Sequence, residues 1–220
     1  MRVYMAGGRL PKGRLSYFAG LDIGQLSDHT ALAVMERVYN YEERLDIATQ
    51  VEHRLVHLDR FELGTPYPEV VEKVKAFFAR KPLVSRTRLA VDATGVGLAV
   101  FQDLKKARLP VREILPVLIT AGDKINREGG IWRVPKRDLI HPLRVRFEEK
   151  SIKIPAGLAH LEVLTEELAG YEMKVNQKTG HDSYSNDPRE TPHDDLVLAT
   201  ALAYWSMSNR FGQRTLRLIR

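Results

Sequence analysis

YFAGLDI (17–23) and LAVD (89–92) are the two stretches of sequence that decide the fold. Each is an apolar segment of strand length with one aspartate, Asp22 within the first and Asp92 at the end of the second. A charged group in an apolar strand is costly unless it is paired, hydrogen-bonded or bound to a metal. A turn cap after the strand explains either aspartate taken alone equally well. Together they favour a site, because neighbouring strands lie about 4.8 Å apart and their carboxylates could share a cation.

Hydrophobic patterning around these stretches predicts a single α/β domain. The expected elements are strands over 17–23, 30–38 and 50–61, then a helix with an apolar stripe, strand 89–92, a helix opened by Gly95 and Gly97, and strand 111–119. We expect Thr65 to cap the first of these helices and Pro66 to lie in its first turn. This order describes a mixed sheet followed by βα units. A basic helix (135–150), a helix (158–168), a polar hairpin (170–186) and an apolar helix (194–207) are expected to follow.

Length and composition place limits on the classes of protein to consider. The 220 residues, 44% hydrophobic and 28% charged, suit one sizeable globular domain. We expect it to span 17–208, between a basic arm (1–16) and a basic tail (209–220). The absence of cysteine excludes disulfides and cysteine-bound zinc, and it fits a reducing cytoplasm. No apolar run is long enough to span a bilayer, so no membrane contact is expected.

A third acidic group, His193-Asp194-Asp195, precedes the last predicted helix. An N-cap explains Asp194 but leaves Asp195 unexplained, because Leu196 begins the apolar face at once. Carboxylates from two strands and one helix start suit Mg²⁺ or Mn²⁺, which prefer oxygen ligands. Two such ions, roughly 4 Å apart, can clamp a phosphodiester. Without metal, carboxylates so close together would repel one another.

The net charge of +6 fits a polyanionic partner such as DNA, or simply solubility. Cations concentrate between residues 124 and 153, where phosphate contacts would give affinity without reading bases. The candidates for this surface are Lys124, Arg127, Arg133, Lys136, Arg137, Arg144, Arg146, Lys150 and Lys153. Trp132 and Tyr184 could lie against a nucleic-acid strand. A solvated helix face, with Trp132 in the core, explains several of these residues individually.

Three acidic motifs resemble those of phage large terminases. Gly20-Leu21-Asp22-Ile23-Gly24 with Asp28-His29-Thr30-Ala31 resembles the first, Val91-Asp92-Ala93-Thr94-Gly95-Val96-Gly97 the second, and His193-Asp194-Asp195 with Leu196, Ala199 and Leu202 the third. The resemblance spans about residues 17–207. It implies an RNase H-like fold, with a central mixed sheet of about five strands flanked by helices and an extra β-hairpin near the active site.

The same resemblance assigns roles to particular residues. Asp22, Asp92 and Asp195 would bind the metals, and Asp194 is a close alternate for the third ligand. Asp28 matches a further acidic position in some relatives, although a loop aspartate explains it equally well. His193 could contact a phosphate or stabilise its loop, and Lys174 and Lys178 lie on the predicted hairpin.

The resemblance also implies an activity. The chain would be an endonuclease that depends on Mg²⁺ or Mn²⁺ and cuts double-stranded, concatemeric viral DNA during genome packaging. This would take place in the cytoplasm of the host. An ATPase motor domain, the small terminase and the portal protein would be its partners. The chain has no G-x-x-x-x-G-K-[ST] phosphate loop, so no ATP site is expected in it. The motor would then lie elsewhere, with the basic arm as its point of attachment.

Other functions remain open on sequence grounds. A Holliday-junction resolvase, a transposase or an integrase would also be RNase H-like. Actin-like ATPases and sugar kinases share the Asp-x-Gly turn, but their two lobes are hard to fit into 220 residues. A nucleic-acid-binding module without catalysis is a further alternative.

Overall fold

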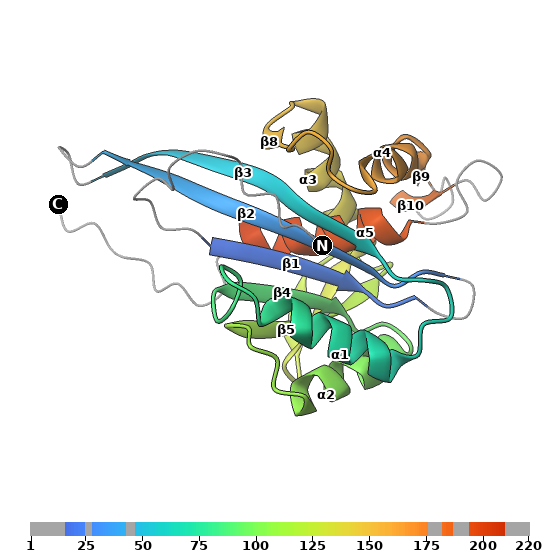
Figure 1. Ribbon diagram of the computed structural model, residues 1–220. Helices are drawn as coiled ribbons and strands as arrows, with labels where there is room; N and C mark the ends of the chain where they lie inside the picture. Colours follow the sequence, from blue (N-terminus) through green and yellow to red (C-terminus); the bar gives the residue numbers. More distant parts are fainter. Residues whose placement is uncertain (1–15, 25–27, 43–46, 176–181, 187–193, 210–220) are drawn as a thin grey trace.

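The computed structural model describes residues 16–24, 28–42, 47–175, 182–186 and 194–209. A mixed eight-stranded sheet forms its centre, with the strand order β6-β7-β5-β4-β1-β2-β3-β8 (Figure 1). The strands are β1 (Ser16–Asp22), β2 (Ala31–Glu42), β3 (Ile47–Arg60), β4 (Thr87–Asp92), β5 (Glu113–Thr120), β6 (Asn126–Glu128), β7 (Ile131–Pro135) and β8 (Ile152–Lys153). The helices are α1 (Tyr67–Phe78), α2 (Gly97–Lys106), α3 (Lys136–Glu148), α4 (Leu161–Ala169) and α5 (Asp195–Ser208).

The five strands predicted from the sequence form the contiguous centre of this sheet. β1, β2 and β3 are antiparallel neighbours, and β4 and β5 follow parallel to β1 on its other side. The prediction of about five strands is three short, because β6, β7 and β8 extend the two edges. β8 has two residues and β6 is an exposed polar triplet, so neither has a hydrophobic pattern to reveal it.

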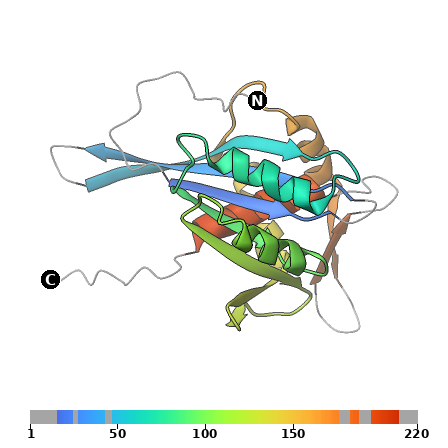
Figure 2. The ribbon, with the colours of Figure 1, turned by 60° about the horizontal axis from the view of Figure 1, so that its bottom comes forward.

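Helices cover both faces of the sheet. α1 and α2 lie side by side on one face (Figure 2), where the predicted apolar stripe of α1 packs into the core. α3, α4 and α5 contribute to a second core on the opposite face. The prediction that Thr65 caps α1 is wrong, because Pro66 holds that position. The Thr65 hydroxyl instead donates to the Glu62 carbonyl at 2.6 Å, within a turn before the helix.

The apolar helix α5 packs directly on β1. A Cβ atom built on Gly20 would lie 1.9 Å from the Ala199 carbonyl oxygen and 2.6 Å from the Ala203 nitrogen. Only glycine therefore allows the helix backbone to approach the strand this closely. Residues 195–207 of the helix are buried, which explains why it is apolar on all sides. This contact brings the start of α5 to the end of the sheet where β1 finishes.

The predicted polar hairpin is confirmed by the antiparallel pair β9 (Tyr171–Val175) and β10 (Asp182–Asn186). Lys174 lies in β9 and Tyr184 in β10, whereas the tip with Lys178 lies outside the described residues. The predicted domain limits of 17 and 208 fall within the described part of the chain. The predicted arm and tail lie almost wholly outside it. No helix in the described ranges is long and apolar enough to cross a membrane.

Candidate metal centre

Asp22 and Asp92 lie side by side at the ends of two neighbouring parallel strands. Leu21 of β1 is in register with Val91 of β4, so the next residue of each strand, Asp22 and Asp92, lies at the same end of the sheet. The sequence predicts this arrangement. Asp22 is only 6% exposed and shares a hydrogen bond with Asp92. Burial raises its pKa well above the usual range, and the charges of Asp92, Asp195 and Asp194 raise it further. Burial and these neighbouring charges therefore favour the protonated form of Asp22.

Asp92 is held in place from the loop that follows it. Its Oδ1 accepts a hydrogen bond from the Thr94 backbone N–H at 2.8 Å, and the Thr94 hydroxyl accepts one from the Ile119 N–H at 3.0 Å. Burial raises the pKa of Asp92, while hydrogen bonds from Thr94 oppose the rise by stabilising the carboxylate. The chain turns back closely after Asp92: a Cβ atom built on Gly97 would lie 2.1 Å from the Asp92 carbonyl oxygen. Only glycine fits at this position.

The start of α5 brings two further carboxylates to the same end of the sheet. Asp195 is 3% exposed and forms an ion pair with Arg60, at 3.0 Å between Oδ2 and Nη2. Asp194 is half-buried and pairs with Lys136, at 2.7 Å between Oδ2 and Nζ. Asp195 acts on the pKa of Asp22 more strongly than Asp194 does. This order favours Asp195 as the third member of the site.

Asp194 occupies the N-cap position of α5, but its side chain makes no capping hydrogen bond. The capping is done from another helix. Glu167 of α4 accepts a hydrogen bond through Oε2 from the Val197 N–H, in the first turn of α5, at 3.0 Å. Glu167 is 3% exposed, and burial raises its pKa to about 7. Because Glu167 supplies the cap, the Asp194 carboxylate is directed elsewhere, toward Lys136.

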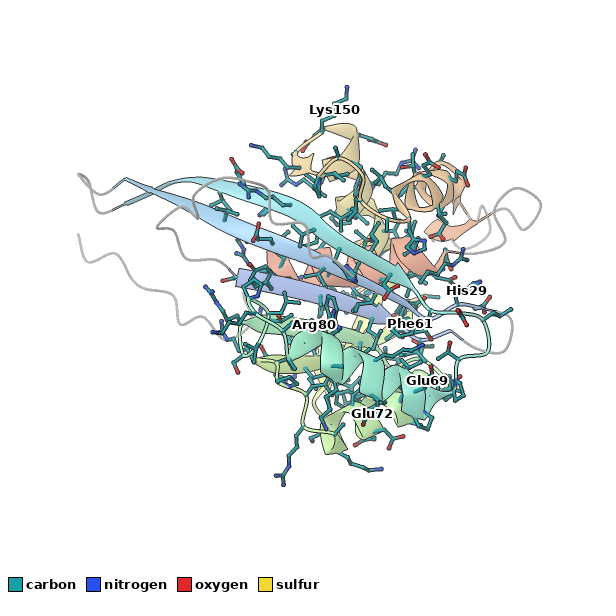
Figure 3. All side chains as sticks on the ribbon, in the orientation of Figure 1. His29, Phe61, Glu69, Glu72, Arg80 and Lys150 are labelled. Carbon is teal, nitrogen blue, oxygen red and sulfur yellow. The ribbon has the colours of Figure 1, made fainter. Side chains whose placement is uncertain are left out.

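The loop after β1 is also fixed at this end of the molecule. His29 Nδ1 donates to the Phe61 carbonyl at 2.7 Å, and the Phe61 N–H donates to the Thr30 carbonyl at 2.8 Å. Figure 3 shows His29 and Phe61 together beside the ends of β1 and β3. Asp28 of this loop is exposed and lines a hollow of about 200 Å³ with Glu62 and Tyr67. Its predicted contact with a second metal stays a prediction.

The four carboxylates fit a hard divalent cation by their chemistry, since all are oxygen ligands. In the described part of the chain, however, no three acidic or histidine side chains are arranged to hold one ion as they stand. Each of these carboxylates already has a partner: Asp22 and Asp92 share a hydrogen bond, while Arg60 and Lys136 pair with Asp195 and Asp194. A divalent ion would compete with these two cations for the same oxygens.

The predicted DNA-binding residues fall into several environments. Lys136 belongs to the acidic centre, whereas Arg133, Arg137 and Arg144 pair with Glu128, Asp123 and Glu148. Lys124 is exposed, and the Arg127 guanidinium stacks 5.2 Å from the Trp132 ring centroid. The Lys174 side chain, Lys178 and His193 lie outside what the structure describes.

Two residues at the metal centre, Arg60 and Glu167, were not predicted from the sequence. Arg60 ends β3 and resembles any surface cation in sequence, although it reaches Asp195, 135 residues away. Glu167 lies in an ordinary amphipathic helix, and its partner Val197 follows 30 residues later. One weak signal exists for Glu167: a helix with two acids at 166 and 167 places one of them on its apolar face.

No protein-family model matches the sequence, and no curated protein matches it. Solved structures do share the fold. One is a mutant nuclease domain of the large terminase subunit of bacterial virus Sf6, with manganese and beta-thujaplicinol: TM-score 0.58, 11% identity, covering 90% of each chain. Another is the human cytomegalovirus terminase nuclease domain, manganese-soaked and inhibitor-bound: TM-score 0.50, 13% identity, covering 88% of this chain and 83% of that one. At such identities the likeness shows the RNase H-like fold, as the sequence predicts.

Proposed function

We propose that this chain is a metal-dependent endonuclease that hydrolyses phosphodiester bonds in double-stranded DNA. One observation carries the proposal: acidic side chains from β1, β4 and α5 converge at one end of the sheet, close enough to raise the pKa of Asp22 together. Buried like charges are expensive to maintain and concentrate at functional sites. The shared fold with manganese-bound terminase nuclease domains supports the same assignment.

The proposed ligands are Asp22, Asp92 and Asp195, with Asp194 beside them. Mg²⁺ or Mn²⁺ would be held there, and a pair of such ions activates water for in-line attack and stabilises the leaving oxygen. The protein's own contribution is orientation. Thr94 fixes the Asp92 carboxylate, Gly20 allows α5 to reach β1, and Glu167 secures the first turn of α5.

The biological setting that fits best is viral genome packaging. The acidic motifs resemble those of phage large terminases, and the solved relatives above are terminase nuclease domains. In this proposal the chain cuts concatemeric viral DNA in the host cytoplasm. An ATPase motor domain, a small terminase and a portal protein would be its partners, because tethering to a motor raises the local concentration of DNA.

The test is incubation of the purified chain with supercoiled plasmid and Mg²⁺ or Mn²⁺, with an EDTA control. The proposal expects nicked and linear products with either metal and none with EDTA. A four-way junction and a strand-joining substrate, tested in parallel, distinguish the other RNase H-like enzymes. Preference for the junction would indicate a resolvase, and joining would indicate a transposase or integrase. Intact plasmid under every metal condition, with the chain folded, would contradict the proposal.

A further inference from the structure

A second cationic feature lies away from the metal centre, in a groove between α2 and the β6–β7 hairpin. Its cavity volume is about 550 Å³. One wall is the end of α2 and the turn after it, and the other is the hairpin with the first half of β5. Four cations line it, and all four are exposed: Lys105, Arg108, Arg112 and Arg127.

The charge of this groove is not balanced from within. Glu113 is the only acid among the lining residues, and it pairs with Arg88 at 2.8 Å. Within the described ranges, no ion pair joins Lys105, Arg108 or Arg112 to another residue. Their backbones are fixed nevertheless, since the N–H groups of Arg108 and Arg112 donate to Lys105 and Thr87 carbonyls at 3.2 and 2.8 Å. A cluster of cations without ion-pair partners attracts a polyanion.

The chemistry of the lining favours phosphate over an acidic peptide. Three of the four cations are arginines, whose planar guanidinium groups match phosphate in a bidentate manner. The accessible apolar surface is small, because Phe101 and Leu109 are buried and Ile114 and Ile131 are partly buried. An apolar protein anchor would therefore find little area here.

The groove lies one helix length from the metal centre, toward the amino ends of β4 and β5. α2 begins beside Asp92 and ends at the groove, and its ten residues span about 15 Å at 1.5 Å per residue. Arg127 connects the groove to the cationic surface already predicted for DNA.

We propose that this groove is a phosphate-binding extension of the DNA surface, which grips the DNA backbone away from the cut. The inference rests on the proposed nuclease function. It adds three contacts that lie outside the predicted basic segment: Lys105, Arg108 and Arg112. Their role is to hold the duplex, independently of the metal ligands.

The test compares two variants with the same loss of charge. The groove variant carries Lys105→Gln, Arg108→Gln and Arg112→Gln. The control carries Lys75→Gln, Arg80→Gln and Lys81→Gln, around the end of α1 and outside the groove lining. Binding to a 30-base-pair duplex is measured in EDTA across a range of NaCl concentrations. Thermal unfolding and Mn²⁺ affinity are measured on both variants to verify the fold and the metal centre.

For the groove variant we expect DNA affinity to fall about ten-fold or more at low salt. The slope of log affinity against log salt should become shallower by up to about 3, at roughly 0.9 per phosphate contact. The control should keep the wild-type slope. Equal slopes for both variants and wild type would overturn the groove assignment while leaving the nuclease proposal intact. A wild-type chain that neither binds nor cuts DNA would overturn both.

Discussion

Glu167→Ala should destabilise the chain and loosen the metal centre, although Glu167 is not among the proposed ligands. The change removes the acceptor of the Val197 N–H, in a pair where Glu167 is 3% exposed and the bond is 3.0 Å long. Leaving a buried donor unpaired costs about 1–3 kcal/mol, and losing a helix cap about 0.5–2 kcal/mol. These ranges describe the same interaction, so we expect about 2 kcal/mol. In a chain of this size that lowers Tm by about 4–8 °C.

The conservative variant Glu167→Gln separates the hydrogen bond from the charge. At pH 6, below the Glu167 pKa of about 7, glutamine matches the neutral acid and still accepts from Val197. It should therefore unfold within about 2 °C of wild type, since a retained hydrogen bond costs little. Mn²⁺ affinity, measured by calorimetry, should fall for alanine and be retained for glutamine. Glu166→Ala is the matched control, because Glu166 is the exposed neighbour.

If Glu167→Ala unfolds at the same temperature as Glu166→Ala, the bond to Val197 does not secure α5. If alanine and glutamine weaken Mn²⁺ binding equally, the carboxyl group itself, and not the hydrogen bond to Val197, is what the metal centre requires.

Further predictions concern stability and ATP turnover. His57 of β3 is 7% exposed, and burial lowers its pKa to about 4. The unfolded chain then binds the proton more readily, so stability is complete above about pH 6.5 and falls by about 3 kcal/mol toward pH 4. Denaturant titrations should show this loss in wild type and less of it in His57→Leu; equal pH dependence would exclude His57 as the cause. Gly20→Ala should cost at least about 3 kcal/mol, because its Cβ would lie 1.9 Å from the Ala199 oxygen. A wild-type midpoint in urea for this variant would contradict the close contact. The purified chain should not turn over ATP in a phosphate-release assay, and robust hydrolysis lost in Asp22→Asn would favour an actin-like enzyme.

The sequence alone predicts the centre of the fold, because there the physical signals are local and strong. Apolar runs that end in Asp22 and Asp92 are unusual, and their pairing follows once both strands enter one sheet. The start of α5 is equally visible, as an acidic pair that precedes a run of apolar residues. These features depend on periodicity and on the high cost of burying charge, both of which can be evaluated without coordinates.

What the sequence does not predict depends on contacts between distant segments. Glu167 and Val197 are 30 residues apart, and Arg60 and Asp195 are 135 apart. No local rule connects such pairs. The cationic groove is missed for the same reason, since its residues come from α2, β5 and the hairpin. Thr65 shows the opposite error, a strong local capping signal that the turn before α1 overrides.

The central claim is that Asp22, Asp92 and Asp195 jointly hold the metal that cuts DNA. The most direct test measures plasmid cleavage and Mn²⁺ binding for Asp22→Asn, Asp92→Asn and Asp195→Asn. Asp103→Asn is the control, because Asp103 lies on α2 and pairs with Lys106. We expect each of the three variants to lose about 100-fold or more in cleavage rate and to bind Mn²⁺ more weakly. All should remain folded, because Asp22→Asn and Asp92→Asn remove a buried, repelling charge. In Asp195→Asn the amide oxygen can still accept the hydrogen bond from Arg60. Cleavage at the wild-type rate by these three variants, with Mn²⁺ binding unchanged, would contradict the account.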